Sequence, residues 1–225
     1  MSSPVKASEL ELRPGVFTRL VAAAYDAFQA KAEREVFAGH RRELLRSAEG
    51  RVLEMSTGTG ANYAHYRKDV RLDLVALEPD PGMLARAVKK ARQVGLHVEF
   101  DQSGAYPLPF EDESFDVAVY CLCLCTIPDA GRALGEARRV LRPGGRLLFL
   151  EHVRSSDPGL ARWQDRLRGP WKVFALGCNC NRETLALIEA SGLSIEEIHK
   201  TSDNRIPIPI VRPLIIGVAR KPGVM

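Results

Sequence analysis

Two glycines and two carboxylates form the most specific chemical pattern in this chain. Gly58 and Gly60 stand in the stretch "LEMSTGTGANY", Glu54 precedes them, and Glu78 ends the next apolar run. Glycines in a turn allow a positive φ and let a ligand approach the backbone closely. A carboxylate at the end of a second strand can accept hydrogen bonds from both hydroxyls of a ribose. The pattern predicts a ligand built on a nucleoside.

Two ligands fit such a loop, a nicotinamide or flavin dinucleotide and S-adenosylmethionine. A pyrophosphate prefers G-x-G-x-x-G, whose third glycine allows close packing of helix on strand, and Tyr63 takes that position here. Glu54 would repel a pyrophosphate but can pair with the ammonium group of a methionine moiety. The loop favours S-adenosylmethionine, with a dinucleotide oxidoreductase as a competing interpretation.

The order of apolar runs predicts how these residues are positioned. Strand and helix patterns alternate after the glycine loop, which is typical of a doubly wound, mostly parallel sheet. In such a sheet the ligand lies beyond the carboxyl ends of the strands. We expect a Rossmann-like α/β fold of seven strands with an antiparallel last strand, and a helix from about Ala61. The strands are expected at residues 51–55, 72–78, 96–100, 115–124, 145–153, 194–200 and 214–221.

A chain of 225 residues suits one α/β domain with additions. Apolar residues recur at helical spacing from Val16 to Ser47. We therefore expect an N-terminal helical arm over residues 1–48, belonging to the same domain as the ligand-binding part over residues 49–225. Asp26 is expected to hold this arm in place.

Composition and charge exclude several classes of protein. No window approaches the roughly 18 consecutive apolar residues of a membrane-spanning helix, and the start lacks the apolar core of a signal peptide. We expect a cytoplasmic protein without stable membrane insertion, for which peripheral membrane contact is open. The net charge of +4 comes from scattered Lys and Arg, so we expect no nucleic-acid partner. The sequence leaves the oligomeric state undetermined.

The five cysteines favour reduced thiols, because their number is odd and no export signal is present. Cys121, Cys123 and Cys125 alternate along an expected strand, so their side chains should share one face. Cys178 and Cys180 are expected to be structural. We expect no metal site, since the spacing differs from that of zinc ligands.

At this point the chain resembles the class I S-adenosylmethionine-dependent methyltransferases, from Val52 to Lys221. The resemblance rests on "LEMSTGTG", "ALEPDPGML", "LPFEDESFD" and "RVLRPGGRLLFLEH". Within that family, "GTGANY", "CLCLCTIPD", "LEHV", "GCNCNRET" and "VRPLIIGVARK" look closest to the small thiol S-methyltransferase-like branch and to bacterial phospholipid N-methyltransferase-like and quinone methyltransferase-like proteins.

The resemblance implies S-adenosylmethionine as cofactor and a set of contacts to it. These contacts are Glu54 to the methionine ammonium, the backbone of Ser56, Gly58 and Gly60 to methionine and ribose, Glu78 to the ribose hydroxyls, Met83 near the adenine, Gly104 and Ala105 at the adenine edge, and Cys121 with Leu122 along the cofactor. The sequence departs from the family twice. Ser56 stands where the loop usually has its first glycine, and no acidic side chain stands at Gly104, the nearest substitutes being Asp101 and Gln102.

Methyl transfer is an in-line displacement, so the enzyme's main contribution is alignment. A thiol or neutral amine needs only orientation, whereas an alcohol or ring carbon needs a base. The candidate bases are His152 and Tyr25, and either can instead be a packing residue. We expect the arm, the Trp163–Asn181 segment and the Ile206–Val211 segment to build an apolar pocket. The acceptor is then a small, largely apolar thiol, amine, phenol or lipid- or quinone-like molecule. A non-catalytic protein of the same fold is the alternative.

Overall fold

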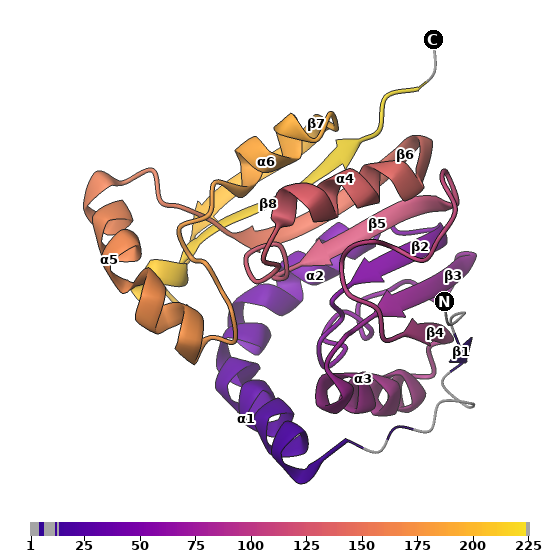
Figure 1. Ribbon diagram of the computed structural model, residues 1–225, viewed down its shortest axis with the longest axis horizontal. Coiled ribbons are helices and arrows are strands. Elements are labelled where there is room, and N and C mark those ends of the chain that lie inside the picture. The colour runs from indigo at the N-terminus through magenta and orange to yellow at the C-terminus, as the bar shows by residue number, and fades with distance from the viewer. Residues whose placement is uncertain (1–4, 7–11, 13, 224–225) are drawn as a thin grey trace.

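The computed structural model describes residues 5–6, 12 and 14–223. The remaining residues of the expected arm and domain, 1–4, 7–11, 13 and 224–225, lie outside the described part. One twisted sheet runs through the molecule with helices on both faces (Figure 1). The strands are β1 (Val5–Lys6), β2 (Gly50–Met55), β3 (Leu72–Leu77), β4 (Val98–Asp101), β5 (Phe115–Cys121), β6 (Leu141–His152), β7 (Ser194–Ser202) and β8 (Pro213–Arg220). The α-helices are α1 (Val16–Ala32), α2 (Ala38–Leu45), α3 (Pro81–Val94), α4 (Ala130–Val140), α5 (Pro158–Phe174) and α6 (Thr184–Ala190).

The strand order is β1-β4-β3-β2-β5-β6-β8-β7. Strands β4, β3, β2, β5 and β6 are parallel, and β8 runs antiparallel between β6 and β7. The expected doubly wound sheet with an antiparallel last strand is thus confirmed. The sequence did not predict the short β1, which pairs antiparallel with β4 through Val5 and Phe100.

The central strands are buried because helices cover both faces of the sheet. The last four residues of β2 and of β3 are buried, as expected for strands of a parallel sheet. The core divides into two apolar clusters, one for each face. Helix α3 begins where the Asp80 side chain accepts the Met83 N–H at 2.8 Å and ends at Gly95, whose φ is 66°. The carboxyl ends of β2 and β3 are thereby fixed against the helix that follows.

Residues 16–45 of the arm form one continuous helical run, as their apolar spacing predicts. Helix α1 passes through a π-helical segment, Glu33–Phe37, into α2. The start of α1 packs on the start of α3, where a Cβ on Gly82 would lie 2.5 Å from the Thr18 carbonyl oxygen. Glycine at that position therefore allows the arm to lie close to the sheet domain.

The helix expected from about Ala61 is wrong, because that segment forms consecutive turns. The N–H of Gly60 bonds the Thr57 carbonyl at 3.0 Å, and that of Tyr63 bonds the Gly60 carbonyl at 3.3 Å. The Tyr63 and Tyr66 rings are buried. Their hydroxyls meet polar groups of the loop, Tyr66 donating to Glu54 at 2.6 Å. These side-chain contacts hold the backbone in tight turns in place of a regular helix.

The strand expected over residues 115–124 is too long, since β5 ends at Cys121. Leu122 has a φ of 58°, and the backbone N–H groups of the next three residues turn toward the Glu151 carboxylate. The expectation that Cys121, Cys123 and Cys125 share one strand face is therefore wrong. A buried carboxylate in the neighbouring strand ends the ladder.

The sequence pattern did not predict helix α5. Asp157 caps this helix by accepting the Leu160 N–H at 2.7 Å, and Pro158 occupies the first turn. Only Ala161 and Gln164 of the helix are buried.

Candidate active site

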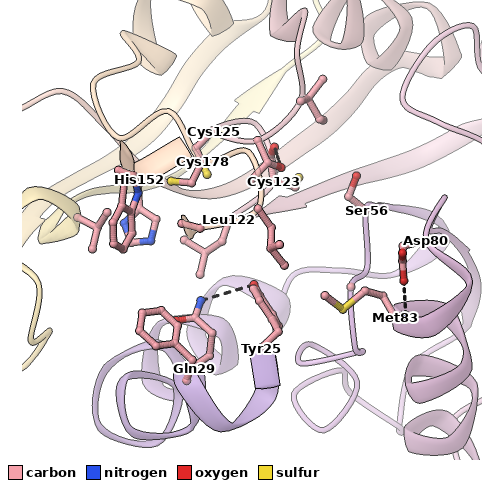
Figure 2. A pocket seen from close by; sticks show the side chains of 18 of the residues that line it. Tyr25, Gln29, Ser56, Asp80, Met83, Leu122, Cys123, Cys125, His152 and Cys178 are labelled. Carbon is pink, nitrogen blue, oxygen red and sulfur yellow. Dashed lines mark hydrogen bonds between the residues drawn. The ribbon is translucent and has the colours of Figure 1, made fainter. Parts of the chain in front are cut away.

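A cavity of about 620 Å³ lies at the carboxyl ends of the central strands. Figure 2 shows Ser56, Asp80 and Met83 toward one end of it, His152, Cys125 and Cys178 toward the other, and Leu122 between them. We call these the cofactor end and the acceptor end. The cofactor end consists of turns that follow strands, and the acceptor end is closed by α1, by α5 and the residues after it, and by residues 206–211.

The glycine loop presents bare backbone to the cofactor end. Ser56 has a φ of 47°, which is in the left-handed region that glycine adopts more readily. The turn is therefore made here by a residue that carries a side chain. Gly58 has a φ of 59°, and a Cβ built on it would meet no atom within 4 Å. Both residues line the cavity. The loop therefore leaves room for a ligand against its backbone.

Glu78 follows β3 and brings a carboxylate to the same place. Its Oε2 accepts the Gly58 N–H at 2.8 Å, and its Oε1 accepts the Asp80 N–H at 3.0 Å. Burial raises the pKa of this carboxyl, and the two backbone hydrogen bonds act in the opposite direction. The side chain lines the cavity. Each oxygen keeps a lone pair for hydroxyl groups of a ligand.

Met83, Gly104 and Ala105 also line the cofactor end, as the sequence predicts. A Cβ on Gly104 would meet nothing within 4 Å, so the backbone is open there too. Asp101 and Gln102, the two substitutes for the missing acid, do not contribute to the lining. Asp101 is buried, accepts the Ser103 N–H at 2.7 Å through Oδ1, and has no partner for Oδ2.

Three predicted cofactor residues, Glu54, Gly60 and Cys121, lie behind the cavity wall. Glu54 is 1% exposed and accepts hydrogen bonds from Thr57 at 2.5 Å and from Tyr66. Its pKa is raised by burial. A Cβ on Gly60 would lie 2.5 Å from the Tyr63 ring. Glu54 and Gly60 thus support the glycine loop from within the protein. After β5, Leu122 and Cys123 line the cavity in place of Cys121.

The arm is joined to this loop by two side chains. Asp26 of α1 accepts a hydrogen bond from Thr59 at 2.5 Å and forms an ion pair with Arg86 of α3 at 2.5 Å. Arg41 of α2 donates to Asn62 at 2.6 Å and to Glu33 at 2.9 Å. The expectation that Asp26 holds the arm is confirmed. Helix α1 therefore has a fixed position relative to the cofactor end.

The acceptor end is apolar and built from the three segments that the sequence indicated. Its lining includes Phe28 and Phe37 of the arm, Trp171 of α5, and Ile206 and Ile208. Other apolar residues of the same segments lie outside it. Phe17 is 77% exposed and Trp163 is 55% exposed, so these two face solvent.

The two candidate bases lie in the cavity but are poorly suited to take a proton. Burial lowers the pKa of His152 to about 4, and its Nδ1 is buried without a partner. Its ring meets the edge of Phe37 with centroids 5.9 Å apart. Burial raises the pKa of Tyr25, whose hydroxyl lies 3.5 Å from the Gln29 amide. Neither pKa is close to the neutral value that favours general base catalysis.

The sequence did not single out Glu151, which organises the wall after β5. The Oε1 atom of this fully buried residue accepts the N–H groups of Cys123 and Leu124, each at 2.8 Å, and Oε2 accepts that of Cys125 at 3.2 Å. Burial raises its pKa to about 7 against the effect of these bonds. The only signal was a carboxylate at the end of an apolar strand, in "LEHV".

Cys125 and Cys178 lie side by side at the acceptor end (Figure 2). The Asn179 N–H donates to the Cys125 carbonyl at 2.8 Å and joins the two segments. A hydrogen bond with Cys178 and burial raise the pKa of the Cys125 thiol well above its ordinary value. All five cysteines are free thiols. The pair adds a soft, weakly polar patch to an otherwise hydrocarbon wall.

Comparison with known proteins identifies the family. Residues 53–149 match a family model described as a methyltransferase domain. A thiol S-methyltransferase from Homo sapiens is 31% identical over 206 residues, which cover 88% of this chain and 81% of that protein. The chain belongs to the class I S-adenosylmethionine-dependent methyltransferases.

Other relatives of this methyltransferase align over shorter stretches. A demethylmenaquinone methyltransferase from Thermus thermophilus is 39% identical over 108 residues, 48% of this chain and 49% of that protein. A solved structure from Thermotoga maritima, titled a possible histamine N-methyltransferase, shares the fold. It covers 91% of this chain and 97% of its own, with a TM-score of 0.65 and 24% identity.

The methyltransferase therefore uses S-adenosylmethionine, and a non-catalytic role or a dinucleotide ligand is no longer favoured. Such a cofactor fits the open backbone at Gly58 and Gly104. It also fits the Glu78 carboxylate, which can accept further hydrogen bonds besides the one from Gly58. The individual contacts remain predictions. Within the described residues, none of the helices is both long enough and apolar enough to cross a membrane.

Proposed function

We propose that this methyltransferase transfers the methyl group to the sulfur of a small, apolar thiol. The relatives that align over most of the chain are named thiol S-methyltransferases. The acceptor end supports this assignment because its wall is mainly aromatic and aliphatic. Such a wall accommodates a small apolar molecule and excludes water from the reacting atoms.

The observation that carries the proposal is the protonation behaviour of the acceptor end. At neutral pH His152, with a pKa of about 4, is a weak base, and the raised pKa of Tyr25 keeps its phenol protonated. A phenol, alcohol or ring carbon needs a base in this position, whereas a thiol is partly ionised near neutral pH by itself. A thiol thus needs only the orientation that the cavity provides.

The cofactor end supplies the orientation. S-adenosylmethionine contributes a methyl group that its sulfonium already activates. In our proposal Glu78 accepts from the ribose hydroxyls, the backbone of Ser56 and Gly58 contacts methionine and ribose, and Gly104 with Ala105 meets the adenine edge. Met83 packs on the adenine. Within this arrangement Glu54, Gly60 and Cys121 support the wall from behind, and the ammonium group would meet Glu54 only through a rearranged loop.

A quinone-like or lipid-like acceptor is the second candidate. Relatives named for demethylmenaquinone and for phosphatidylethanolamine align over about half of this chain. The same apolar cavity would admit such molecules. The cytoplasmic location also remains a prediction, supported by five unpaired thiols.

The experiment is a turnover assay with matched acceptors. The purified protein is incubated with S-adenosylmethionine and a small alkyl thiol, the alcohol and amine of the same carbon skeleton, or a short-chain quinol, and S-adenosylhomocysteine is measured. We expect turnover with the thiol and a rate that rises with pH up to the pKa of that thiol. Turnover with the quinol alone would replace the thiol by the second candidate.

A further inference from the structure

Exposed apolar side chains are concentrated on two helices of this enzyme. Among the described residues, all but one of the large apolar side chains that face solvent belong to α1, to α5 or to the residues directly after α5, the exception being Ile198 on β7. We call this set the α1–α5 surface: Val16, Phe17, Leu20, Phe28, Trp163, Leu167, Val173, Phe174 and Leu176. Large exposed apolar side chains gathered on neighbouring helices mark an interaction site.

Helix α1 turns an apolar stripe outward. Phe17, Leu20, Ala24 and Phe28 are all exposed and follow one another at helical spacing. Phe17 is 77% exposed and Leu20 is 64% exposed. The one acidic residue of this helix, Asp26, is engaged by Thr59 and Arg86. The outward face therefore carries hydrocarbon without negative charge.

Helix α5 combines a similar stripe with positive charge. Trp163, Leu167 and Phe174 lie within one face at helical spacing and are exposed. The four basic residues of the helix are Arg162, Arg166, Arg168 and Lys172. The guanidinium of Arg166 lies 5.8 Å from the centre of the Trp163 ring. The single acid of α5, Asp165, is paired with Arg154 at 2.5 Å.

The two helices meet at the entrance to the cavity. The rings of Phe28 and Phe174 touch edge to face, with centroids 5.4 Å apart, and α1 and α5 approach each other at the same side of the molecule in Figure 1. Phe28 and Leu176 belong both to this surface and to the cavity lining. The α1–α5 surface is therefore continuous with the acceptor end.

We propose that the α1–α5 surface docks on the face of an anionic lipid bilayer, with the acceptor end opening toward the lipid. An aromatic and aliphatic face accompanied by Arg and Lys is the composition that partitions into the interface of such a bilayer. Arg and Lys keep their charged groups at the phosphates while their stems and the aromatic rings contact hydrocarbon. A second copy of this chain fits less well, because a symmetric contact would place the same cations opposite one another.

This arrangement gives the apolar acceptor a direct route. A molecule dissolved in the bilayer would enter between α1 and α5 without crossing water. The docking itself requires neither cofactor nor acceptor. It can therefore be tested independently of which atom is methylated.

The test is flotation of the purified protein with vesicles of phosphatidylcholine containing phosphatidylglycerol, and with vesicles of phosphatidylcholine alone. We expect binding to the anionic vesicles that weakens as salt is added. The double variant Leu20→Glu, Val173→Glu should bind at least about ten-fold more weakly, because it places charge where hydrocarbon should enter the lipid. Ile198→Glu, which changes the exposed apolar residue outside the surface, should bind like the wild type.

Melting curves and S-adenosylmethionine titrations without vesicles check that the variants are folded. Both substituted side chains are largely exposed, at 64% for Leu20 and 83% for Val173, so neither measurement should change. Wild-type protein that stays with the dense fraction, or equal binding of all variants, would overturn the proposal. So would sedimentation data showing a dimer that the double variant dissociates, since the surface would then be an interface between copies.

Discussion

The two ends of the cavity are built in different ways. At the cofactor end, backbone groups and one carboxylate are held by short hydrogen bonds, such as those from Gly58 and Asp80 to Glu78 at 2.8 and 3.0 Å. At the acceptor end, side chains of helices added before and after the central strands, including Phe28 and Trp171, form a wall by packing. Polar contacts specify one ligand, whereas apolar packing admits a class of molecules. A constant methyl donor and a less restricted acceptor match this division.

The largest effect should come from removing the carboxylate at the cofactor end. Glu78→Ala should weaken S-adenosylmethionine binding by about 1 to 3 kcal/mol, the range for losing hydrogen bonds to a charged group. Calorimetric titration measures this, with Glu189→Ala on the exposed part of α6 as the matched control. Unchanged affinity in Glu78→Ala would mean that the polar end does not hold the ribose.

At the acceptor end, His152 should affect acid stability more than chemistry. Its pKa is about 4 in the folded protein and ordinarily 6.5, so the unfolded chain binds a proton first as the pH falls. The free energy of unfolding should therefore decrease between these two values. Between pH 7 and pH 5, the free energy of unfolding of His152→Gln should fall by roughly 2 kcal/mol less than that of the wild type.

Urea unfolding at both pH values measures the effect of His152→Gln, with His199→Gln on exposed β7 as control. Turnover of the thiol at neutral pH should stay within about ten-fold of the wild type, whereas losing a general base costs about 100-fold or more. A much larger loss would show that His152 does act as a base, and the two ends would then differ less than we propose.

The two tryptophans of α5 allow a comparison between a residue that lines the cavity and one on the surface. Trp171 lines the cavity, whereas Trp163 is 55% exposed. Trp171→Ala should raise the KM for an apolar thiol by about ten-fold, equivalent to about 1.4 kcal/mol of lost contact, and leave the affinity for S-adenosylmethionine unchanged. Trp163→Ala should change neither value in an assay without lipid. Equal effects of the two substitutions would contradict the assigned acceptor end.

The smallest effect concerns the glycine loop. Ser56 adopts a left-handed backbone conformation, with a φ of 47°. Ser56→Gly should relieve the strain of that conformation and raise the free energy of unfolding by no more than about 1 kcal/mol. Cofactor affinity should be retained. Ser202→Gly in strand β7 should have the opposite sign, since glycine there only adds freedom to the unfolded chain. Thermal melts distinguish the two outcomes.

The cofactor end could be predicted from the sequence because its determinants are local. Ser56, Gly58, Glu78 and Gly104 stand in turns that follow strands, and Met83 lies in the first turn of the helix after β3. Parallel strands bring such turns to one edge of the sheet. The alternation of apolar runs was enough to place them. Glu54 is the exception at this end, because the buried Tyr66 hydroxyl donates a hydrogen bond to its carboxylate. The sequence pattern did not predict that Tyr66 points inward.

The acceptor end depends on contacts between distant segments. Glu151 ends β5 from a neighbouring strand, through bonds to residues 26 to 28 positions away. Helix α5 buries only Ala161 and Gln164, and its apolar residues Trp163 and Leu167 face solvent, so the side chains that make this helix amphipathic do not pack in the core. The low pKa of His152 likewise follows from burial that only the assembled arm and strands create. Residue types suggested an apolar pocket, but its chemistry required the fold.

The contacts between arm and glycine loop set a boundary for protein engineering. Because Asp26 bonds Thr59 and Arg86, and Arg41 bonds Asn62, the arm and the loop form one polar unit. A chimera that took the arm of a relative to acquire its acceptor preference would separate these partners unless loop and α3 residues came with it. The segment to exchange therefore extends from the start of α1 into α3. A division placed between the arm and β2 would separate these hydrogen-bond partners.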